Sequence, residues 1–322
     1  MNENKYIFPS FSSTVAHLLP LLSVLLLLAT ACSKKEVEPE PKPEEVRTLK
    51  FSFDNASQPD VDAIREIEVF VFDDQEQLIG RASTHIDGTV VLNYPQTPTL
   101  HCVVWGNSKD SSLELLDLQW GDPLDKGYLA LKTISPVRAE RTCCNTPPEL
   151  LRGAIQLDNN TAFVNQQPTQ VDLLQTTATM HIMIDGLPEA TGTESGDYTV
   201  EITGQASRID FSGSYGGKTL HSLTGIFNAK KEYIIPPFHL FPTAAGEGIT
   251  VNILHDGKLL KSITRTSNGK PLLPEAGKVM TLLIEFTFSG DIEIEVKPPA
   301  WNSTDIEVEV NPQKQHKNNS DK

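Results

Sequence analysis

The chain has few basic residues and few cysteines, and it lacks the motifs of the common enzyme classes. Lysine and arginine number 27 against 42 aspartates and glutamates, which gives a formal net charge of −15. Proteins that bind nucleic acids or adsorb to anionic lipid headgroups present a basic surface instead. The acidic balance therefore predicts no nucleic-acid partner. It also indicates that any membrane contact comes from something other than the protein surface.

Cysteine is scarce, with four residues in 322. Apart from Cys32, the chain contains Cys102, Cys143 and Cys144, an odd number. No C-x-x-C pair occurs and no histidine lies near the vicinal pair, so we expect no metal site. A disulfide from Cys102 to either Cys143 or Cys144 would leave the other thiol free, and the spacing does not choose between them.

Motifs for catalysis are also missing. The sequence has no G-x-S-x-G elbow, no P-loop and no dinucleotide-binding glycine fingerprint. Its eight histidines are scattered along the chain. We therefore expect no enzyme activity, no catalytic residues and no cofactor. Of the three tryptophans, Trp105 lies in a predicted buried strand, whereas Trp120 and Trp301 border predicted turns and could contact a ligand.

The one long apolar run lies near the N-terminus, at residues 18–28. It is too short for a comfortable membrane span, and the small residues 29–31 and then Cys32 follow it, as in an export signal. The cleavage site resembles the bacterial lipobox, in which the cysteine becomes the acylated first residue of the mature chain, although Ala29 stands where leucine is more usual. An ordinary secretory signal with a chance cysteine is the alternative. We predict a signal peptide at 1–31 and lipid attachment at Cys32.

The next segment, 32–46, is charged and rich in proline, which predicts a semi-extended tether with no core of its own. The remaining chain consists of short β-type segments separated by turn residues. Asp87-Gly88 and Asp256-Gly257 are strong hairpin signals, and only residues 111–119 indicate a short helix. Pro236 and Pro237 indicate an edge strand, since proline cannot donate to a ladder.

Strands without helices predict an all-β fold of antiparallel sandwiches. A mature chain of about 290 residues suggests two domains. We place the boundary at Pro168, which gives an N-terminal sandwich at 47–168 and a C-terminal sandwich at 169–311. The polar residues 312–322 form a predicted disordered tail.

The C-terminal region carries one pattern twice, at residues 291–296 and 305–310. Each copy alternates aliphatic and acidic side chains. If the two copies paired directly, their carboxylates would repel one another. They are therefore expected to pair with other strands or to lie at a sheet edge, where charge discourages unwanted strand addition. A calcium site is the weaker alternative, because no turn gathers the ligands.

Several segments follow one another in a recognisable order behind the lipobox cysteine. They are Ile67–Asp73 with Leu78, Val103–Asn107, Leu150–Gly153, Tyr198–Gly204, and Ile292–Ile294 with Trp301. Together they resemble the fimbrillin-associated anchor family of Bacteroides-type bacteria. Two features depart from that family: residues 96–99 replace the expected Pro-Gly turn, and the vicinal cysteine pair is unfamiliar.

The resemblance implies two tandem transthyretin-like β-sandwich domains and a lipid-anchored position on the outer membrane, at the base of a fimbrium. Fimbrial shaft subunits are the implied partners, joined by β-strand addition, in which backbone hydrogen bonds give affinity and alternate apolar side chains fill a groove. Within this chain, the alternating segment with Asp305, Ile306, Val308 and Val310 is the candidate for strand exchange.

Two other functions stay open. The first is a shaft or tip pilin of the same assembly class, which would be trimmed after an arginine, here Arg47 or Arg65. The second is a surface glycan-binding lipoprotein that uses Trp120 or Trp301.

Overall fold

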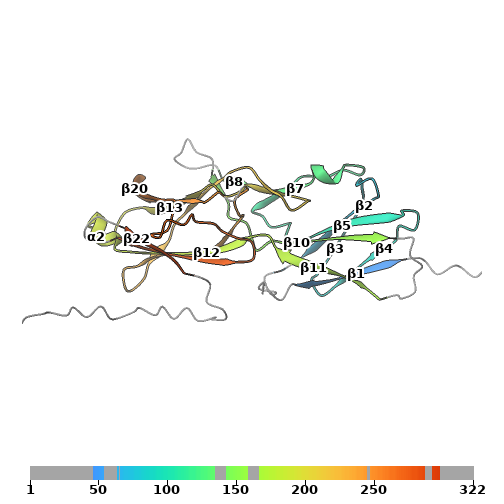
Figure 1. Cartoon of the computed structure of the whole chain (residues 1–322), viewed down its shortest axis with the longest axis horizontal. Coiled ribbons are helices and arrows are strands. Elements are labelled where there is room, and N and C mark those ends of the chain that lie inside the picture. Colours follow the sequence, from blue (N-terminus) through green and yellow to red (C-terminus); the bar gives the residue numbers. More distant parts are fainter. Residues whose placement is uncertain are drawn as a thin grey trace, which may run out of the picture. The chain divides into compact units, whose positions relative to one another are not determined.

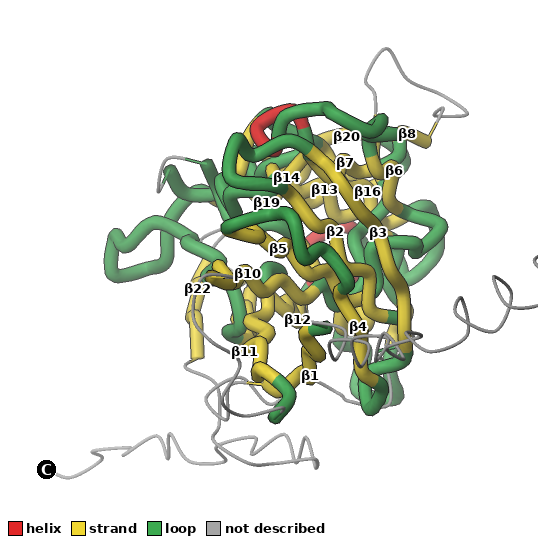
Figure 2. The backbone as a smooth tube through the Cα atoms, turned by 90° about the vertical axis from the view of Figure 1, so that its right-hand side faces the viewer, coloured by secondary structure: helices red, strands yellow, loops and turns green. Residues whose placement is uncertain are grey.

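The computed structural model describes residues 46–53, 64, 66–134, 143–158, 167–244, 247–286 and 292–297, and all of them belong to one compact unit. Strands dominate this part of the chain, and its helices are α2 (Leu187–Thr191) and the single 3-10 turn η2 (Leu124–Lys126). Figures 1 and 2 show this predominance of strands. The predicted all-β class is confirmed. The signal peptide, Cys32, Arg65, Trp301 and the segment 305–310 lie outside the described residues.

The first large element is a seven-stranded sheet that folds over on itself. Its strands are β1 (Arg47–Phe53), β2 (Ile67–Phe72), β3 (Leu78–Thr84), β4 (Thr89–Leu92), β5 (Thr99–Gly106), β10 (Leu151–Asp158) and β11 (Thr169–Gln175), in the order β3-β2-β5-β10-β11-β1-β4. Because successive side chains alternate between the faces of a strand, β5 contributes to two cores. Cys102 and Val104 face an inner cluster with Leu49 and Val171, and Trp105 faces the other side.

The sheet turns a corner between β10 and β11. Strand β10 pairs with β5 along all eight of its residues, but with β11 only at Leu151↔Gln175 and Arg152↔Leu174. Beyond these positions β11 pairs in parallel with β1. Gly153 lies at the divergence, where an added Cβ would come 2.8 Å from the carbonyl oxygen of Asp172. Only glycine therefore lets the two backbones pass so closely.

A second cluster, here called the aromatic cluster, packs on the other face of β2 and β5. It includes the buried Phe70, Phe72, Trp105, Phe211 and Phe241. A four-stranded sheet covers it, built from β6 (Leu113–Leu115), β7 (Tyr128–Leu131), β14 (Arg208–Asp210) and β15 (Tyr215–Gly216). Strand β14 pairs with β7, so a segment from the second half of the chain packs against the first half (Figure 2).

The C-terminal strands form two further sheets around a third cluster. One sheet has the order β17-β18-β12-β21-β22 and the other β16-β13-β19-β20. Their bounds are β12 (Ala178–Asp185), β13 (Tyr198–Thr203), β16 (Leu220–Leu223), β17 (Ile226–Phe227), β18 (Tyr233–Leu240), β19 (Thr250–His255), β20 (Lys258–Ile263), β21 (Val279–Phe286) and β22 (Ile292–Lys297). Inward side chains of both sheets, such as Ile182, Val200 and Val251, share this core.

Several local predictions are settled by these pairings. The hairpin at Asp256-Gly257 is confirmed, since β19 and β20 pair across it and both residues have positive φ, 50° and 75°. The prediction of a hairpin at Asp87-Gly88 is wrong, because the turn forms but β4 pairs with β1 and not with β3. The strand pairs are mostly antiparallel, as expected for the sandwiches, and two of them, β1–β11 and β12–β21, are parallel.

The helix predicted at residues 111–119 does not form. Leu113 is buried and pairs with Leu131 of β7, which places it in strand β6. The tertiary pairing overrides the weak local signal of a serine cap.

The chain changes sheets later than predicted. Residues 169–175 form β11 of the first sheet, although we assigned them to the C-terminal domain. Residues Ala206, Ile209 and Phe211 also pack into the aromatic cluster with Trp105. The two-domain division itself stays a prediction.

Candidate assembly interface

The three described cysteines are free thiols. Cys102 is buried in the inner cluster, and burial raises its pKa to about 12. Cys144, in the short strand β9 (Cys143–Cys144), is buried in the aromatic cluster on the opposite face of β5. The sheet therefore lies between these two thiols, and the structure does not contain the disulfide that the sequence left open.

Trp105 and Trp120 lie in contrasting environments. Trp105 is fully buried in β5, as predicted, and the guanidinium of Arg152 lies 6.0 Å from its ring. Trp120 is 72% exposed, at a turn, also as predicted. Within the described residues no group of three or more His, Cys, Asp and Glu side chains is placed to hold a metal ion.

Strand addition needs an open sheet edge, so the edges are the candidate contact surfaces. Strand β18 offers one, because β17 pairs only with its residues Tyr233 and Ile234. The remainder of that edge carries Pro236 and Pro237, which have no N–H to donate. This confirms the edge-like character predicted for the segment, and it makes the edge a poor template for another strand.

Strand β20 is a second edge, and it too is protected. Lys258 and Lys261 lie on it, and a register shift between Ile253 and Leu254 interrupts its pairing with β19. Edge lysines and bulges are the usual devices against unwanted strand pairing. Strand β3 is covered where it begins, because Leu78 exchanges backbone hydrogen bonds with Gly121 and Asp122.

Strand β10 differs from these edges. Between Ala154 and Leu157 its second edge has no ladder partner among the described strands, because β11 has turned away. This stretch contains no proline, no lysine and no bulge, and its outward side chains Ala154 and Gln156 are exposed. Of these four edges, β10 therefore fits an incoming strand best. Gly153 marks the corner in the sequence, but a lone glycine in a strand does not by itself specify an open edge.

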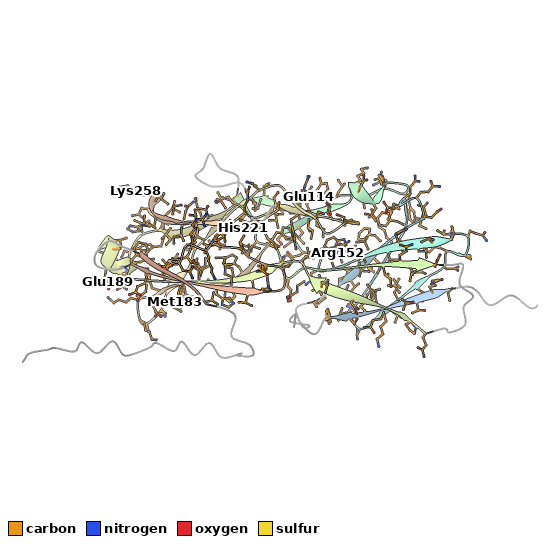
Figure 3. All side chains as sticks on the ribbon, viewed as in Figure 1. Glu114, Arg152, Met183, Glu189, His221 and Lys258 are labelled. Carbon is orange, nitrogen blue, oxygen red and sulfur yellow. The ribbon has the colours of Figure 1, made fainter. Side chains whose placement is uncertain are left out.

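A hollow of about 230 Å³ lies beside this edge. Its lining includes His101 to Val103 of β5, Arg152 and Ala154 to Gln156 of β10, Leu124, Phe211 and Ser212. The Arg152 guanidinium closes one side, since its Nε donates to the carbonyl oxygen of Phe211 at 3.1 Å (Figure 3). Burial lowers the pKa of Arg152, and the nearby carboxylate of Asp210 opposes that shift. The hollow could receive one or two side chains of an added strand.

In the part of the chain that the structure describes, no helix has both the length and the apolar character needed to cross a membrane. The predicted lipid attachment at Cys32 and the predicted exchange segment 305–310 lie outside that part.

Comparison with known proteins adds a family. The model described as "Fimbrillin-A associated anchor proteins Mfa1 and Mfa2" matches residues 43–307. The major fimbrium anchoring subunit FimB of Porphyromonas gingivalis is 23% identical over 307 residues, which cover 88% of this chain and 95% of that protein in strain W83.

Solved structures share the fold. The fimbrial anchor protein Mfa2 from Porphyromonas gingivalis superposes with a TM-score of 0.56 at 11% identity, over 79% of this chain and 97% of that one. A DUF1812 protein from Bacteroides thetaiotaomicron superposes with a TM-score of 0.59 at 15% identity, over 79% and 98%. These likenesses extend over nearly the whole of both relatives.

Proposed function

Because the chain belongs to the family of the fimbrillin-A associated anchor proteins Mfa1 and Mfa2, we propose that it is the lipid-anchored subunit at the base of a fimbrium on the outer membrane. The observation that carries the proposal is the match over residues 43–307, behind a lipobox cysteine. Members of this family associate with fimbrial subunits, and two of the relatives, FimB and Mfa2, are anchoring proteins of fimbriae. A role in assembly, without catalysis, is consistent with both.

The proposed anchor is the acylated Cys32. One acyl chain gives only marginal membrane binding, so firm attachment needs two or more chains on this residue. The proline-rich segment 33–45 then spaces the folded part from the bilayer, by up to about 40 Å if it is fully extended.

The proposed joint to the shaft is β-strand addition. In the segment 305–310, Ile306, Val308 and Val310 alternate with acidic residues, so one face can fill an apolar groove while the backbone pairs with a neighbour. A division into two sandwich modules, with the change of sheet after Gln175, is part of the same proposal. The open edge of β10 is the described place where this chain would receive a strand in return.

Two deletions test the joint. In cells that produce the shaft subunits, removal of residues 305–322 should release fimbriae into the medium, whereas removal of 312–322 alone should leave them on the cells. Fimbriae in medium and cell fractions are then compared by immunoblot. Unchanged retention after the longer deletion would remove the segment 305–310 from the mechanism.

A substitution tests the anchor. Cys32→Ala should abolish metabolic labelling with palmitate and free both the subunit and its fimbriae. If the unsubstituted protein takes up no label, the lipid-anchor proposal fails.

The pilin role is the second candidate, and one observation bears on it. Strand β1 pairs on both sides, with β11 and with β4, and it buries Leu49 and Phe51. A cut after Arg65 would detach this whole strand and open a groove, whereas a cut after Arg47 would leave nearly all of it in place. Sequencing the N-terminus of the mature protein decides: a blocked Cys32 supports the anchor, and a start just after Arg47 or Arg65 supports a pilin.

A further inference from the structure

Trp120 has the largest exposed fraction of the exposed large apolar side chains in the described residues, at 72%. A single exposed apolar residue is ordinary in itself. What distinguishes Trp120 is the rigidity of its support. The four residues 119–122, here called the Trp120 turn, form a closed hydrogen-bonded turn at the surface.

Three sets of hydrogen bonds fix this turn. The Asp122 N–H donates to the carbonyl oxygen of Gln119 at 3.0 Å, and Gly121 at the third position has a φ of 81°, as in a type II turn. The Asp122 carboxylate accepts from the Gln119 N–H at 2.7 Å and from Lys126 Nζ at 2.8 Å. The backbone of Gly121 and Asp122 is bonded to Leu78 of β3, with both distances 2.9 Å.

The turn is also anchored from below. Leu118, two residues before Trp120, is buried in the aromatic cluster, and its carbonyl oxygen accepts a hydrogen bond from Arg81. The backbone from which the indole projects is thus fixed before any partner arrives. A tryptophan side chain has only two rotatable bonds, so on a fixed backbone it loses little conformational entropy on binding.

The surroundings of Trp120 indicate the kind of partner. Asp117 and Gln119 precede it in the chain, with the Gln119 Nε2 donating to Asp117 Oδ2 at 2.8 Å, and the Asp117 side chain is 82% exposed. Asp125 and Lys126 are exposed as well, and none of the exposed large apolar side chains other than Trp120 lies between residues 116 and 126. The core of a protein–protein interface is depleted of charged residues and gathers several apolar ones, which this surface does not.

A sugar ring has the complementary properties. One of its faces is apolar and comparable in size to an aromatic ring, and its rim carries hydroxyl groups that donate to carboxylates and amides. We propose that the Trp120 turn is a carbohydrate-binding site, on which a neutral sugar ring stacks on the indole and bonds Asp117 and Gln119 through its hydroxyls. The net charge of −15 selects against polysaccharides rich in carboxylate or sulfate. The site is independent of the anchoring role proposed above.

The test first measures binding of the full mature chain to an array of neutral oligosaccharides and of acidic ones that carry uronic acids or sulfate. A neutral polysaccharide related to those that bind is then cast into native gels, and the retardation of each variant is measured. Trp120→Ala should weaken binding tenfold or more, and Trp120→Phe should keep part of it. Ile226→Ala, which truncates another apolar side chain of similar exposure (69%), is the matched control and should bind normally. Thermal denaturation of each variant checks that the fold is retained.

Gly121→Ala supplies a second variant. A Cβ at this position meets nothing within 4 Å, but the φ of 81° disfavours any side chain, so the turn should relax while the indole is still present. Weaker sugar binding in this variant would support presentation by the turn.

Three outcomes overturn the proposal: no neutral glycan binds, Trp120→Ala binds as well as the unsubstituted chain, or only acidic glycans bind. Retention of fimbriae on cells should not change in Trp120→Ala. If retention falls while no glycan binds, the turn contacts a protein, and the carbohydrate proposal is wrong although the anchoring proposal stands.

Discussion

Truncation of Phe211 tests how the second half of the chain is held to the first. Phe211 follows β14 and inserts its ring, which is fully buried, into the aromatic cluster. The ring centroid lies 4.9 Å from that of Phe70, 5.7 Å from that of Trp105 and 6.2 Å from that of Phe72. The three residues directly before Phe211 form β14, which pairs with β7, so the ring and the ladder secure the same segment.

Phe211→Ala should lower the free energy of unfolding by about 3–5 kcal/mol, because a buried phenylalanine loses its transfer free energy and leaves a cavity. The hydrogen bond from Arg152 goes to the carbonyl oxygen of Phe211, which the substitution keeps. The loss therefore reports on the ring. Urea denaturation followed by circular dichroism measures it.

The matched control is Phe51→Ala, which truncates a buried phenylalanine of the inner cluster in β1. Both variants should lose similar stability, but hydrogen exchange should differ. Amides of β7 and β14 should exchange faster in Phe211→Ala than in Phe51→Ala, because only the first variant loosens that ladder. A cost below about 1 kcal/mol for Phe211→Ala, or equal exchange in both variants, would refute this account of the contact.

Three further changes have defined outcomes. Acidification from pH 7.5 to 5 should lower the urea midpoint, because burial lowers the pKa of His181, His221 and His239 in the folded protein. Below about pH 6.5, the histidine pKa of the unfolded chain, the unfolded state binds more protons, so the free energy of unfolding falls by at most about 1.4 kcal/mol per pH unit for each histidine. His221→Gln should make the free energy of unfolding depend less steeply on pH, and an unchanged dependence would contradict the role of His221. Gly153→Ala should cost about 1–3 kcal/mol, because the new Cβ meets the Asp172 carbonyl oxygen at 2.8 Å; a neutral result in the same denaturation assay would mean that the β10–β11 corner can relax. In mass-spectrometric thiol labelling of the folded protein, half-buried Cys143 should react first and Cys102 last, since the Cys102 pKa is about 12; early labelling of Cys102 would contradict its burial.

Local turn chemistry was predictable from sequence, whereas the choice of strand partner was not. Asp256-Gly257 makes a hairpin because β20 pairs with β19, the strand that precedes it, along its length. Asp87-Gly88 makes a turn of the same composition, yet β4 crosses to pair with β1 in the opposite layer. The alternating pattern of β4 fits either neighbour, so the sequence cannot distinguish them. The error at 111–119 has the same origin, since the pairing of β6 with β7 makes residues 113–115 a strand.

The candidate site was predictable to a similar degree. The sequence correctly predicted that Trp105 is buried and Trp120 exposed. Trp105 lies within an apolar run, whereas Trp120 lies beside a glycine. The open edge of β10 was not predictable, because it depends on where β11 leaves the ladder. Gly153 marks that place, but a lone glycine in a strand is equally consistent with a bulge.

The connection between β11 and β12 bears on how an anchor would withstand pulling. Only Thr176 and Thr177 separate these strands, so the first passage of the chain from one group of sheets to the other is very short. Thr176 is tied on both sides: its N–H and its hydroxyl donate to the carbonyl oxygen of Leu150, at 2.8 and 3.0 Å, and its own carbonyl accepts from the Tyr215 hydroxyl at 2.6 Å.

Tyr215 belongs to the same segment as Phe211, so one element both packs into the aromatic cluster and restrains the connection. If lipid holds the chain at Cys32 and the shaft pulls on its C-terminal end, the force passes through residues 176–177. Hydrogen bonds that are loaded together resist separation better than the same bonds loaded in turn. Tyr215→Phe removes one of these hydrogen bonds without creating a large cavity, so it should lower the free energy of unfolding without load by about 1 kcal/mol. It should also lower the unfolding force measured by single-molecule stretching between residues 46 and 297. An unfolding force equal to that of the unsubstituted chain would show that the connection does not carry the load.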